Sequence, residues 1–302
     1  EIDSHASSLT LPMSSCYPRC MNEHIIILFY KFVTVAEPEA LRDAQRALCT
    51  ELGIKGRLLI AKEGVNGTFE GTREQIDAYK AAWHAIPEFA DLKFKESKGT
   101  GQAFSKIDIK VRDEVVTLGA GEFDIPKETA REMTAEELEA LYESGEEFTV
   151  LDLRNDYEIQ VGQFEKTEHP NLRNFRDLPE KLATISHLKK KKVVAVCTGG
   201  IRCEKATCLL EREGFEDVYQ LKDGIHTYMQ KFPGKHFKGT LFVFDNRMVT
   251  PVVEAPTREI VGRCFECDTP CEDVYSNDNF RPSLKVICCK NCIAKHSELR
   301  TA

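Results

Sequence analysis

The sequence predicts an α/β protein made of three parts, and three patterns support this prediction. Over residues 21–125 the apolar segments follow the order strand, helix, strand, strand, helix, strand. Over residues 130–240 short apolar strands alternate with helices. Residues 250–302 hold six of the twelve cysteines in a segment with few apolar side chains. A chain of 302 residues is long enough for two or three such units, whereas residues 1–20 contain no clear element and stay unassigned.

In the first part, the pair Asn66-Gly67 predicts a turn between two strands. Asn-Gly supplies the positive φ angles of a tight hairpin, so we expect Glu63–Thr68 to form that turn. The predicted elements are a strand (Ile25–Val33), a helix (Pro38–Leu52), two strands (Gly56–Ala61 and Thr68–Glu70), a helix (Arg73–His84) and a strand (Ile107–Val111). This order is the ferredoxin-like plan, which is used for scaffolding, RNA binding and catalysis alike and specifies no function.

The second part begins with a capping box, in which Thr134 can cap the helix Ala135–Glu143 and Glu137 follows three residues later. The predicted strands are Val150–Leu153, Val193–Val196 and Val218–Leu221, and further helices are predicted at Arg202–Glu213 and Ile225–Lys231. Alternation of this kind implies a parallel sheet that is covered by helices on both faces.

Composition indicates a soluble protein of a reducing compartment. Hydrophobic residues make up 42% and charged residues 30% of the chain. No apolar run reaches the roughly 18 residues of a membrane span, and no secretory signal is evident. Twelve cysteines in such a chain indicate thiol or metal chemistry rather than a disulfide scaffold. We therefore expect a cytoplasmic protein without membrane contact.

Charge does not identify the partner. The formal net charge is −8, which argues weakly against nucleic acid. However, the stretch Lys93–Arg112 holds six basic and two acidic residues, and Lys189–Lys192 is an unbroken lysine run. Either stretch could contact phosphates, and either could equally be a solvated surface. The sequence also has no GxGxxG loop, so no nucleotide cofactor motif is seen, and no 2-His-1-carboxylate pattern.

The segment Val193–Cys203 carries the strongest chemical signal. A buried strand ends at Cys197, Gly199 and Gly200 permit a tight curl, and a helix begins near Arg202. Backbone N–H groups converge on the centre of such a loop, so a cysteine there should be largely thiolate at neutral pH. We predict that Cys197 is the nucleophile and that Arg202 is catalytic beside it. The active-site loop would comprise Thr198, Gly199, Gly200, Ile201 and Cys203.

The spacing of the loop favours sulfur chemistry over phosphate chemistry. Cysteine phosphatases use Cys-x5-Arg, whereas Cys197 and Arg202 are one residue closer, which suits a single sulfur on the cysteine. The alternative is a buried structural cysteine near a helix start. The loop resembles the active loop of rhodanese sulfurtransferases, in which the matching cysteine carries a persulfide. Leu151–Glu158 resembles the strand that supports this loop in that family, with Asp152 and Arg154 expected to support the loop rather than to catalyse.

Four separated motifs resemble the bacterial tRNA uridine hydroxylase family over roughly residues 21–295. They are Cys197–Ala206, Glu63–Thr68, Lys110–Gly119 and Phe242–Arg247. The resemblance implies a rhodanese-like central domain and tRNA as partner. It also implies hydroxylation of the wobble uridine to 5-hydroxyuridine, with molecular oxygen as co-substrate and a persulfide role for Cys197.

The sequence departs from that family after Glu158. The family usually has Gly-His-Phe-Lys-Gly-Ala, and this chain has Gly-Gln-Phe-Glu-Lys-Thr over Gly162–Thr167. The small Gly-Ala pair is missing, so the turn beneath the active loop is expected to differ. Cys203 could resolve a persulfide or sulfenate on Cys197, or it could be a core residue. Cys49 and Cys208 are expected in the core, and no role is assigned to Cys16 and Cys20.

The tail contains two Cys-x2-Cys pairs, Cys264 with Cys267 and Cys289 with Cys292, separated by 21 residues. This is close to zinc-ribbon spacing, so these four thiolates are predicted to hold a structural zinc ion in a segment with too small a core to fold alone. Cys271, Cys288 and His296 are further candidate ligands. Six free thiols and an iron–sulfur cluster are the alternatives.

Two other functions remain open from the sequence. One is plain sulfur transfer through a Cys197 persulfide, which would need a sulfur donor as partner. Hydroxylation, in turn, could need a thiol reductant as partner. The other is a non-catalytic binding module whose loop senses redox state, although the intact Cys197 and Arg202 argue against it.

Overall fold

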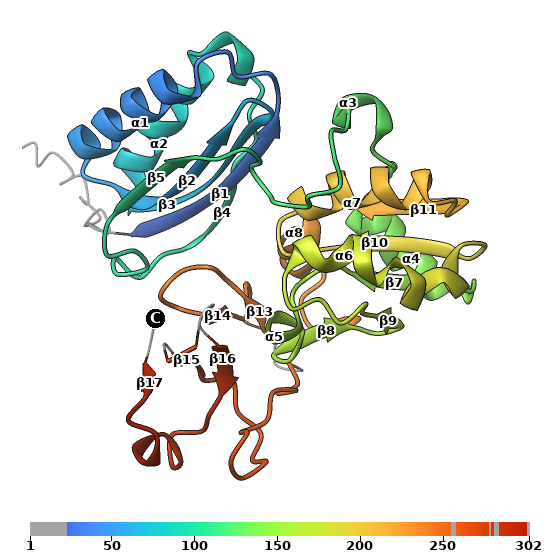
Figure 1. The fold of residues 1–302 in the computed structure, drawn as a ribbon. Helices are drawn as coiled ribbons and strands as arrows, with labels where there is room; N and C mark the ends of the chain where they lie inside the picture. Colours follow the sequence, from blue (N-terminus) through green and yellow to red (C-terminus); the bar gives the residue numbers. More distant parts are fainter. Residues whose placement is uncertain (1–22, 255–257, 278, 281–283, 301–302) are drawn as a thin grey trace, which may run out of the picture.

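The computed structural model describes residues 23–254, 258–277, 279–280 and 284–300, and it has the predicted α/β architecture (Figure 1). Cys16 and Cys20 lie outside the described residues. Within the described ranges, no helix is long and apolar enough to cross a bilayer.

The N-terminal domain is a five-stranded sheet with two helices on one face (Figure 1). The elements are β1 (His24–Phe32), α1 (Pro38–Leu52), β2 (Lys55–Ala61), β3 (Gly64–Thr72), α2 (Arg73–His84), η1 (Pro87–Phe89), β4 (Lys95–Lys98) and β5 (Ile107–Val111). Alternate residues of each strand point to opposite faces. Phe29 and Leu58 therefore pack with Trp83 of α2 in the core, while Leu28 and Tyr30 lie on the face without helices.

The prediction of a turn at Asn66-Gly67 is wrong. The hairpin turn is Lys62-Glu63, and Asn66 and Gly67 lie inside β3, opposite Tyr30 and Phe29. Gly67 is needed for close packing rather than for a turn, because a Cβ there would lie 2.5 Å from the ring of Phe29. The side chain of Asn66 donates a hydrogen bond to the carbonyl oxygen of Val115 (3.0 Å).

The last predicted strand, Ile107–Val111, does not occupy the position of the fourth strand in the ferredoxin-like plan. The sheet order is β4-β1-β3-β2-β5, so β5 pairs in parallel with β2 at one edge. The short strand β4, which the sequence pattern did not reveal, occupies the opposite edge beside β1. The ferredoxin-like plan thus carries one additional strand.

The central domain confirms the expected parallel sheet with both faces covered. The strands are β6 (Arg131–Met133), β7 (Thr149–Asp152), β9 (Thr167–Glu168), β10 (Lys192–Val196) and β11 (Asp217–Leu221), in the order β6-β11-β10-β7-β9. The helices are α3 (Ile125–Glu128), α4 (Ala135–Ser144), α5 (Asp156–Ile159), α6 (Leu178–Lys181), α7 (Ile201–Arg212) and α8 (Gly224–Lys231), with η2 (Phe175–Asp177) and η3 (Leu182–Leu188). Residues of α6 and α7 pack in one core cluster, and residues of α4 and α8 pack in another. The capping box of Thr134 and Glu137 is present.

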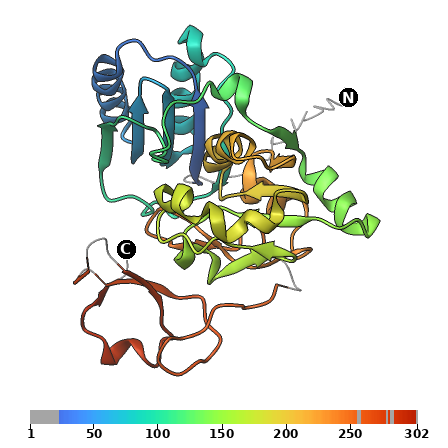
Figure 2. The ribbon, with the colours of Figure 1, turned by 45° about the vertical axis from the view of Figure 1, so that its right-hand side comes forward.

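The C-terminal region is built from short strands around buried cysteines, and Figure 2 shows it below the two domains. β12 (Phe237–Gly239) pairs with β8 (Gly162–Phe164), and β13 (Leu241–Phe242) pairs with β14 (Val249–Thr250). The tail follows as β15 (Val274–Asn277), β16 (Leu284–Ile287), η4 (Ile293–Lys295) and β17 (Leu299–Arg300). Cysteines supply five of the ten buried residues in its core cluster, so apolar burial alone is small.

Candidate active site

The loop after β10 is closed tightly around the sulfur of Cys197. The backbone N–H of Gly200 donates to Cys197 Sγ (3.1 Å), and Gly200 has φ = +102°, a conformation that favours glycine. The N-terminus of α8 binds the other side of the loop, because Ile225 N donates to the carbonyl oxygen of Cys197 (3.0 Å). A Cβ on Gly224 would lie 2.7 Å from Gly199 and Gly200, so α8 and the loop are in direct backbone contact.

This environment makes Cys197 an acidic thiol. Burial raises the pKa of Cys197, but a hydrogen bond from the Cys203 thiol, the charge of Arg202 and backbone N–H groups at the start of α7 together lower it to about 6. Burial and the neighbouring Cys197 raise the pKa of Cys203 well above its ordinary value. Cys197 is therefore the thiolate of the pair at neutral pH, and Cys203 keeps its proton.

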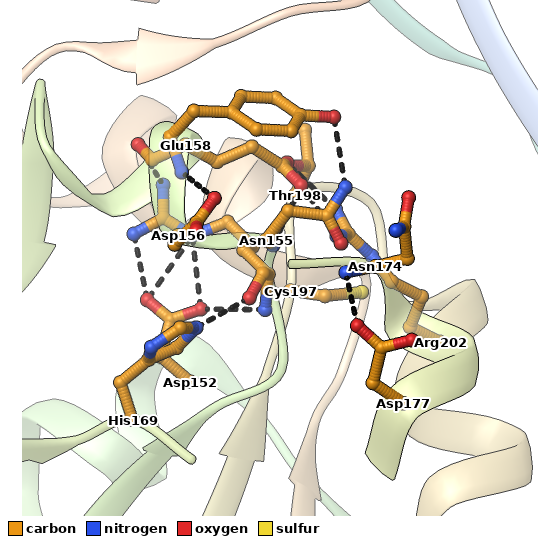
Figure 3. Close-up of polar contacts among 12 residues, drawn as sticks. Asp152, Asn155, Asp156, Glu158, His169, Asn174, Asp177, Cys197, Thr198 and Arg202 are labelled. Atoms are coloured by element: carbon orange, nitrogen blue, oxygen red, sulfur yellow. Dashed lines mark hydrogen bonds and ion pairs between the residues drawn. The ribbon is translucent and has the colours of Figure 1, made fainter. Parts of the chain in front are cut away.

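Arg202 is held by the carboxylate of Glu158, for which the sequence pattern predicts no role. Its guanidinium makes two hydrogen bonds to Glu158, Nη1 to Oε1 at 2.6 Å and Nη2 to Oε2 at 2.8 Å (Figure 3). Glu158 is fully buried and also accepts hydrogen bonds from the hydroxyl of Thr198 (3.2 Å) and the backbone N–H of Asn155 (2.9 Å). The only sequence signal for Glu158 was its position at the end of the segment Leu151–Glu158, which resembles the loop-supporting strand of rhodaneses.

Asp152 and Arg154 form a second buried ion pair. Arg154 Nη2 lies 2.6 Å from Asp152 Oδ2 and donates to the carbonyl oxygen of Gly162 (2.7 Å). The backbone N–H of Leu153 donates to Val196 (2.9 Å), the residue before Cys197. The pair thus connects the end of β7 to the segment that starts at Gly162, and neither residue lines the cleft described below.

In the segment Gly162–Thr167, whose sequence differs from that of the family, Lys166 has φ = +57°, in the left-handed region. Glycine is the residue that adopts this conformation without strain. The family that the sequence resembles has glycine at this position, so this chain forms its turn with a less suitable residue. The ammonium group of Lys166 lies 4.4 Å from the centre of the Phe148 ring, a contact that glycine could not make.

A cleft of about 420 Å³ opens between this loop and the helix-free face of the N-terminal sheet. Its volume falls in the roughly 300–1,000 Å³ range of small-molecule sites. The lining includes Cys197, the aromatic residues Tyr30, Phe175 and Phe244, the basic residues Arg57, Lys110 and Arg176, and the amides Asn66, Asn155 and Asn174. The N-terminal and central domains supply most of the lining, Phe244 follows the central domain, and Cys197 is part of the wall.

The N-terminal domain also holds the loop in place. A Cβ on Gly199 would lie 2.8 Å from Leu28, and one on Gly200 would lie 2.7 Å from the hydroxyl of Tyr30. Lys95 donates to the carbonyl oxygen of Gly199 (3.0 Å) and pairs with Asp223 at 3.2 Å. Lys95 belongs to the basic stretch Lys93–Arg112, but its side chain is only 9% exposed and supports the loop instead of facing solvent.

The remaining cysteines divide into core residues and one cluster. Cys49 and Cys208 are buried in their helices, as expected from their positions. The sulfur atoms of Cys264, Cys267, Cys289 and Cys292 all lie within 4.8 Å of one another, and those of Cys267 and Cys289 are 3.7 Å apart. Tetrahedral zinc with bonds of ~2.3 Å holds its sulfur ligands roughly 3.8 Å apart, so the cluster fits that ion. Cys271 and Cys288 are buried nearby but outside this group, and the ring of His296 packs against Phe265 at 4.8 Å.

The acidity of Cys197 makes a direct prediction. We expect limiting iodoacetamide to label Cys197 before any other core thiol, with a rate that rises with pH and reaches half its maximum near pH 6. Cys208 is the internal control, because burial raises its pKa to about 12. Peptide mass mapping across pH 5–9 measures both. Earlier labelling of Cys203, or a midpoint near the ordinary thiol pKa, would contradict the assignment.

Three family models match successive segments of the chain. A UPF0176 acylphosphatase-like domain matches residues 24–115, a rhodanese-like domain matches residues 134–231, and a rhodanese C-terminal domain matches residues 238–301.

Curated relatives match most of the chain. A tRNA uridine(34) hydroxylase of Cytophaga hutchinsonii is 40% identical over 82% of this chain and 79% of its own. The proteins of that name from Oceanobacillus iheyensis and Bacillus licheniformis are 42% and 39% identical over 83% and 88% of this chain, and over 78% and 84% of their own.

Proposed function

The chain belongs to the tRNA uridine(34) hydroxylase family, and on this basis we propose that it hydroxylates the wobble uridine of tRNA to 5-hydroxyuridine. The observation that carries the proposal is the acidic Cys197 in the wall of a cleft large enough for a nucleobase. The wobble base lies in the anticodon loop, where single-stranded bases can turn outward and stack on aromatic side chains. Tyr30, Phe175 and Phe244 offer such surfaces, and Arg57 and Arg176 can contact phosphates.

The chemistry that Cys197 can supply is covalent activation of the base. A thiolate that adds to carbon 6 of uracil makes the neighbouring carbon 5 electron-rich, and such an intermediate divides one difficult step into two. Molecular oxygen, as co-substrate, then supplies the oxygen atom. The ion pair of Arg202 and Glu158 holds the loop while the thiolate reacts.

Asn155 and Asn174 supply amide groups to the cleft wall, and such groups can hydrogen-bond the N3–H and the carbonyl oxygens of uracil. The Nδ2 of Asn155 already donates to the Tyr157 hydroxyl (2.8 Å).

Nucleoside mass spectrometry of tRNA tests the function. We expect 5-hydroxyuridine and its derivatives at the wobble position to fall in cells that lack the gene and to return on complementation. Plain sulfur transfer is the second candidate, because the Cys197 loop has the rhodanese spacing and the central domain matches rhodanese-like proteins. The products separate the two, since hydroxylation adds oxygen to the base and thiolation replaces oxygen with sulfur. Unchanged 5-hydroxyuridine, with no parallel pathway present, would contradict the proposal.

The tail is proposed to hold one structural zinc ion through Cys264, Cys267, Cys289 and Cys292. Their sulfur atoms are already gathered, and the surrounding core is made largely of cysteine. Zinc would supply folding free energy that the few apolar side chains of the tail do not.

Metal analysis tests this proposal. We expect about one zinc per chain in freshly reduced protein, and loss of the metal in Cys264→Ser. Cys271→Ser and Cys288→Ser remove buried cysteines outside the group, and both are expected to keep the metal. Limited proteolysis should cut the tail of Cys264→Ser much faster. A metal-free wild-type tail with equal protease resistance would refute the zinc site.

A further inference from the structure

Oxygen-dependent hydroxylation of uridine requires two electrons from a reductant. One atom of dioxygen enters the C5–H bond, and the other must take up two electrons and two protons to leave as water. Two thiols that join in a disulfide release two electrons and two protons. A pair of thiols in contact at the reacting centre would therefore balance the reaction within the protein.

Cys197 has such a partner. Cys203 lies in the first turn of α7, its backbone N–H donates to the carbonyl oxygen of Gly200 (2.9 Å), and Gly200 in turn donates to Cys197 Sγ (3.1 Å). The Cys203 side chain lies close enough to Cys197 to be one of the causes that lower the Cys197 pKa. Both side chains are completely buried in the same core cluster. The loop and the first turn of α7 therefore hold the two buried thiols in the same part of the core.

Resting on the proposed function, we propose that Cys203 is the second catalytic thiol and that the Cys197–Cys203 pair is the two-electron donor of the hydroxylation. In each turnover the O–O bond of dioxygen breaks. One oxygen replaces hydrogen on carbon 5 as a hydroxyl group, and the other is released as water that takes up the proton of Cys203 and one proton from solvent. The bond between the Cys197 sulfur and carbon 6 breaks, and an S–S bond forms between Cys197 and Cys203. Dioxygen is reduced, and carbon 5 and the two sulfurs are oxidised.

The buried position of the pair determines how it is reset. Cys197 lines the cleft and Cys203 does not, so the cleft is the route by which an external dithiol would approach the disulfide, from the side of Cys197. Attack there releases Cys203 first and leaves a mixed disulfide on Cys197, which the second thiol of the reductant resolves. Bound tRNA would block this approach, so reduction would follow product release.

A single-turnover experiment on the full-length protein tests the inference. The protein is reduced, freed of reductant, mixed in air with excess tRNA transcript that carries an unmodified wobble uridine, and quenched with an alkylating reagent. We expect a burst of one 5-hydroxyuridine per chain, an equal amount of Cys197–Cys203 disulfide by peptide mapping, and then a stall. Dithiothreitol should restore repeated turnover. Without tRNA, the disulfide should not form on the time scale of the burst.

Two variants identify the thiol. Cys203→Ser is expected to lose the burst, whereas Cys208→Ser, which removes a buried thiol of the same helix whose Sγ donates to the Glu204 carbonyl oxygen, is expected to keep it. Labelling of Cys197 in Cys203→Ser verifies that the loop is folded. Repeated turnover of the wild-type protein without reductant, or product without disulfide, would overturn the inference even if no variant folded. No product from wild-type protein with dithiothreitol present would instead refute the proposed function.

Discussion

Replacement of Cys197 by alanine is expected to reduce hydroxylation of the wobble uridine by on the order of 10⁴-fold or more, because removal of a covalent nucleophile leaves only binding to assist the reaction. The cost in stability is small by comparison. One buried sulfur is lost at a site with no exposed surface, which amounts to about 1 kcal/mol. The variant is therefore expected to fold and to bind tRNA while failing to modify it.

The measurement is the rate of 5-hydroxyuridine formation on a tRNA transcript, with tRNA affinity measured in parallel. Cys208→Ala is the matched control, since it also removes a buried sulfur from the central domain but lies outside the cleft. A Cys197→Ala protein that retains a tenth or more of the wild-type rate would contradict the nucleophile assignment. Loss of activity in this variant alone does not separate hydroxylation from sulfur transfer, because both use this cysteine, whereas the mass of the product does.

The parts of the fold that local sequence patterns determine were predictable. The helices Pro38–Leu52 and Arg73–His84 have the predicted bounds, because apolar spacing and the residues at their ends act within a few positions. The loop after Cys197 was equally accessible, since a buried strand, two glycines and a helix start follow one another within one short segment. In these cases the causes of the structure are neighbours in sequence.

The misses share a different physical origin. Gly67 was interpreted as a turn residue, but it is small because the ring of Phe29 on the neighbouring strand approaches the backbone. The strand Lys95–Lys98 has no apolar alternation, since it is a short edge strand that pairs only with β1. Lys95 was counted in a basic stretch, yet it binds a loop that lies 104 residues away in sequence. Contacts across the chain of this kind leave no local pattern.

Glu158 is the most consequential of these long-range partners. It lies 44 residues before Arg202 in sequence, is fully buried, and accepts two short hydrogen bonds from the guanidinium. A signature of cysteine and arginine indicates that a charge is present in the loop, but it does not indicate what neutralises that charge. Both terminal nitrogens of the Arg202 guanidinium bind Glu158, and the charge of Arg202 lowers the pKa of Cys197.

We expect Glu158→Ala to lower the free energy of unfolding of the central domain by about 3–5 kcal/mol, because it leaves the charge of Arg202 buried without a partner. Glu158→Gln should cost less, since the amide oxygen can still accept one hydrogen bond from Arg202. The double variant Glu158→Ala with Arg202→Met is expected to recover part of the loss, because no unpaired charge remains. Yet it should stay inactive, since Cys197 then lacks the neighbouring positive charge.

Denaturant unfolding of the wild type, Glu158→Ala, Glu158→Gln and the double variant measures these differences. A spectroscopic probe in the central domain reports the unfolding. Glu136→Ala breaks the exposed pair with Lys231 and serves as the control, because solvent screens an exposed pair and its loss should leave the unfolding midpoint nearly unchanged. If Glu158→Ala costs no more than Glu136→Ala, the buried pair does not stabilise the loop. If instead the double variant is less stable than Glu158→Ala, Arg202 stabilises the domain through contacts other than Glu158. The sign of that comparison therefore decides whether the pair acts as one unit that holds the nucleophile in place.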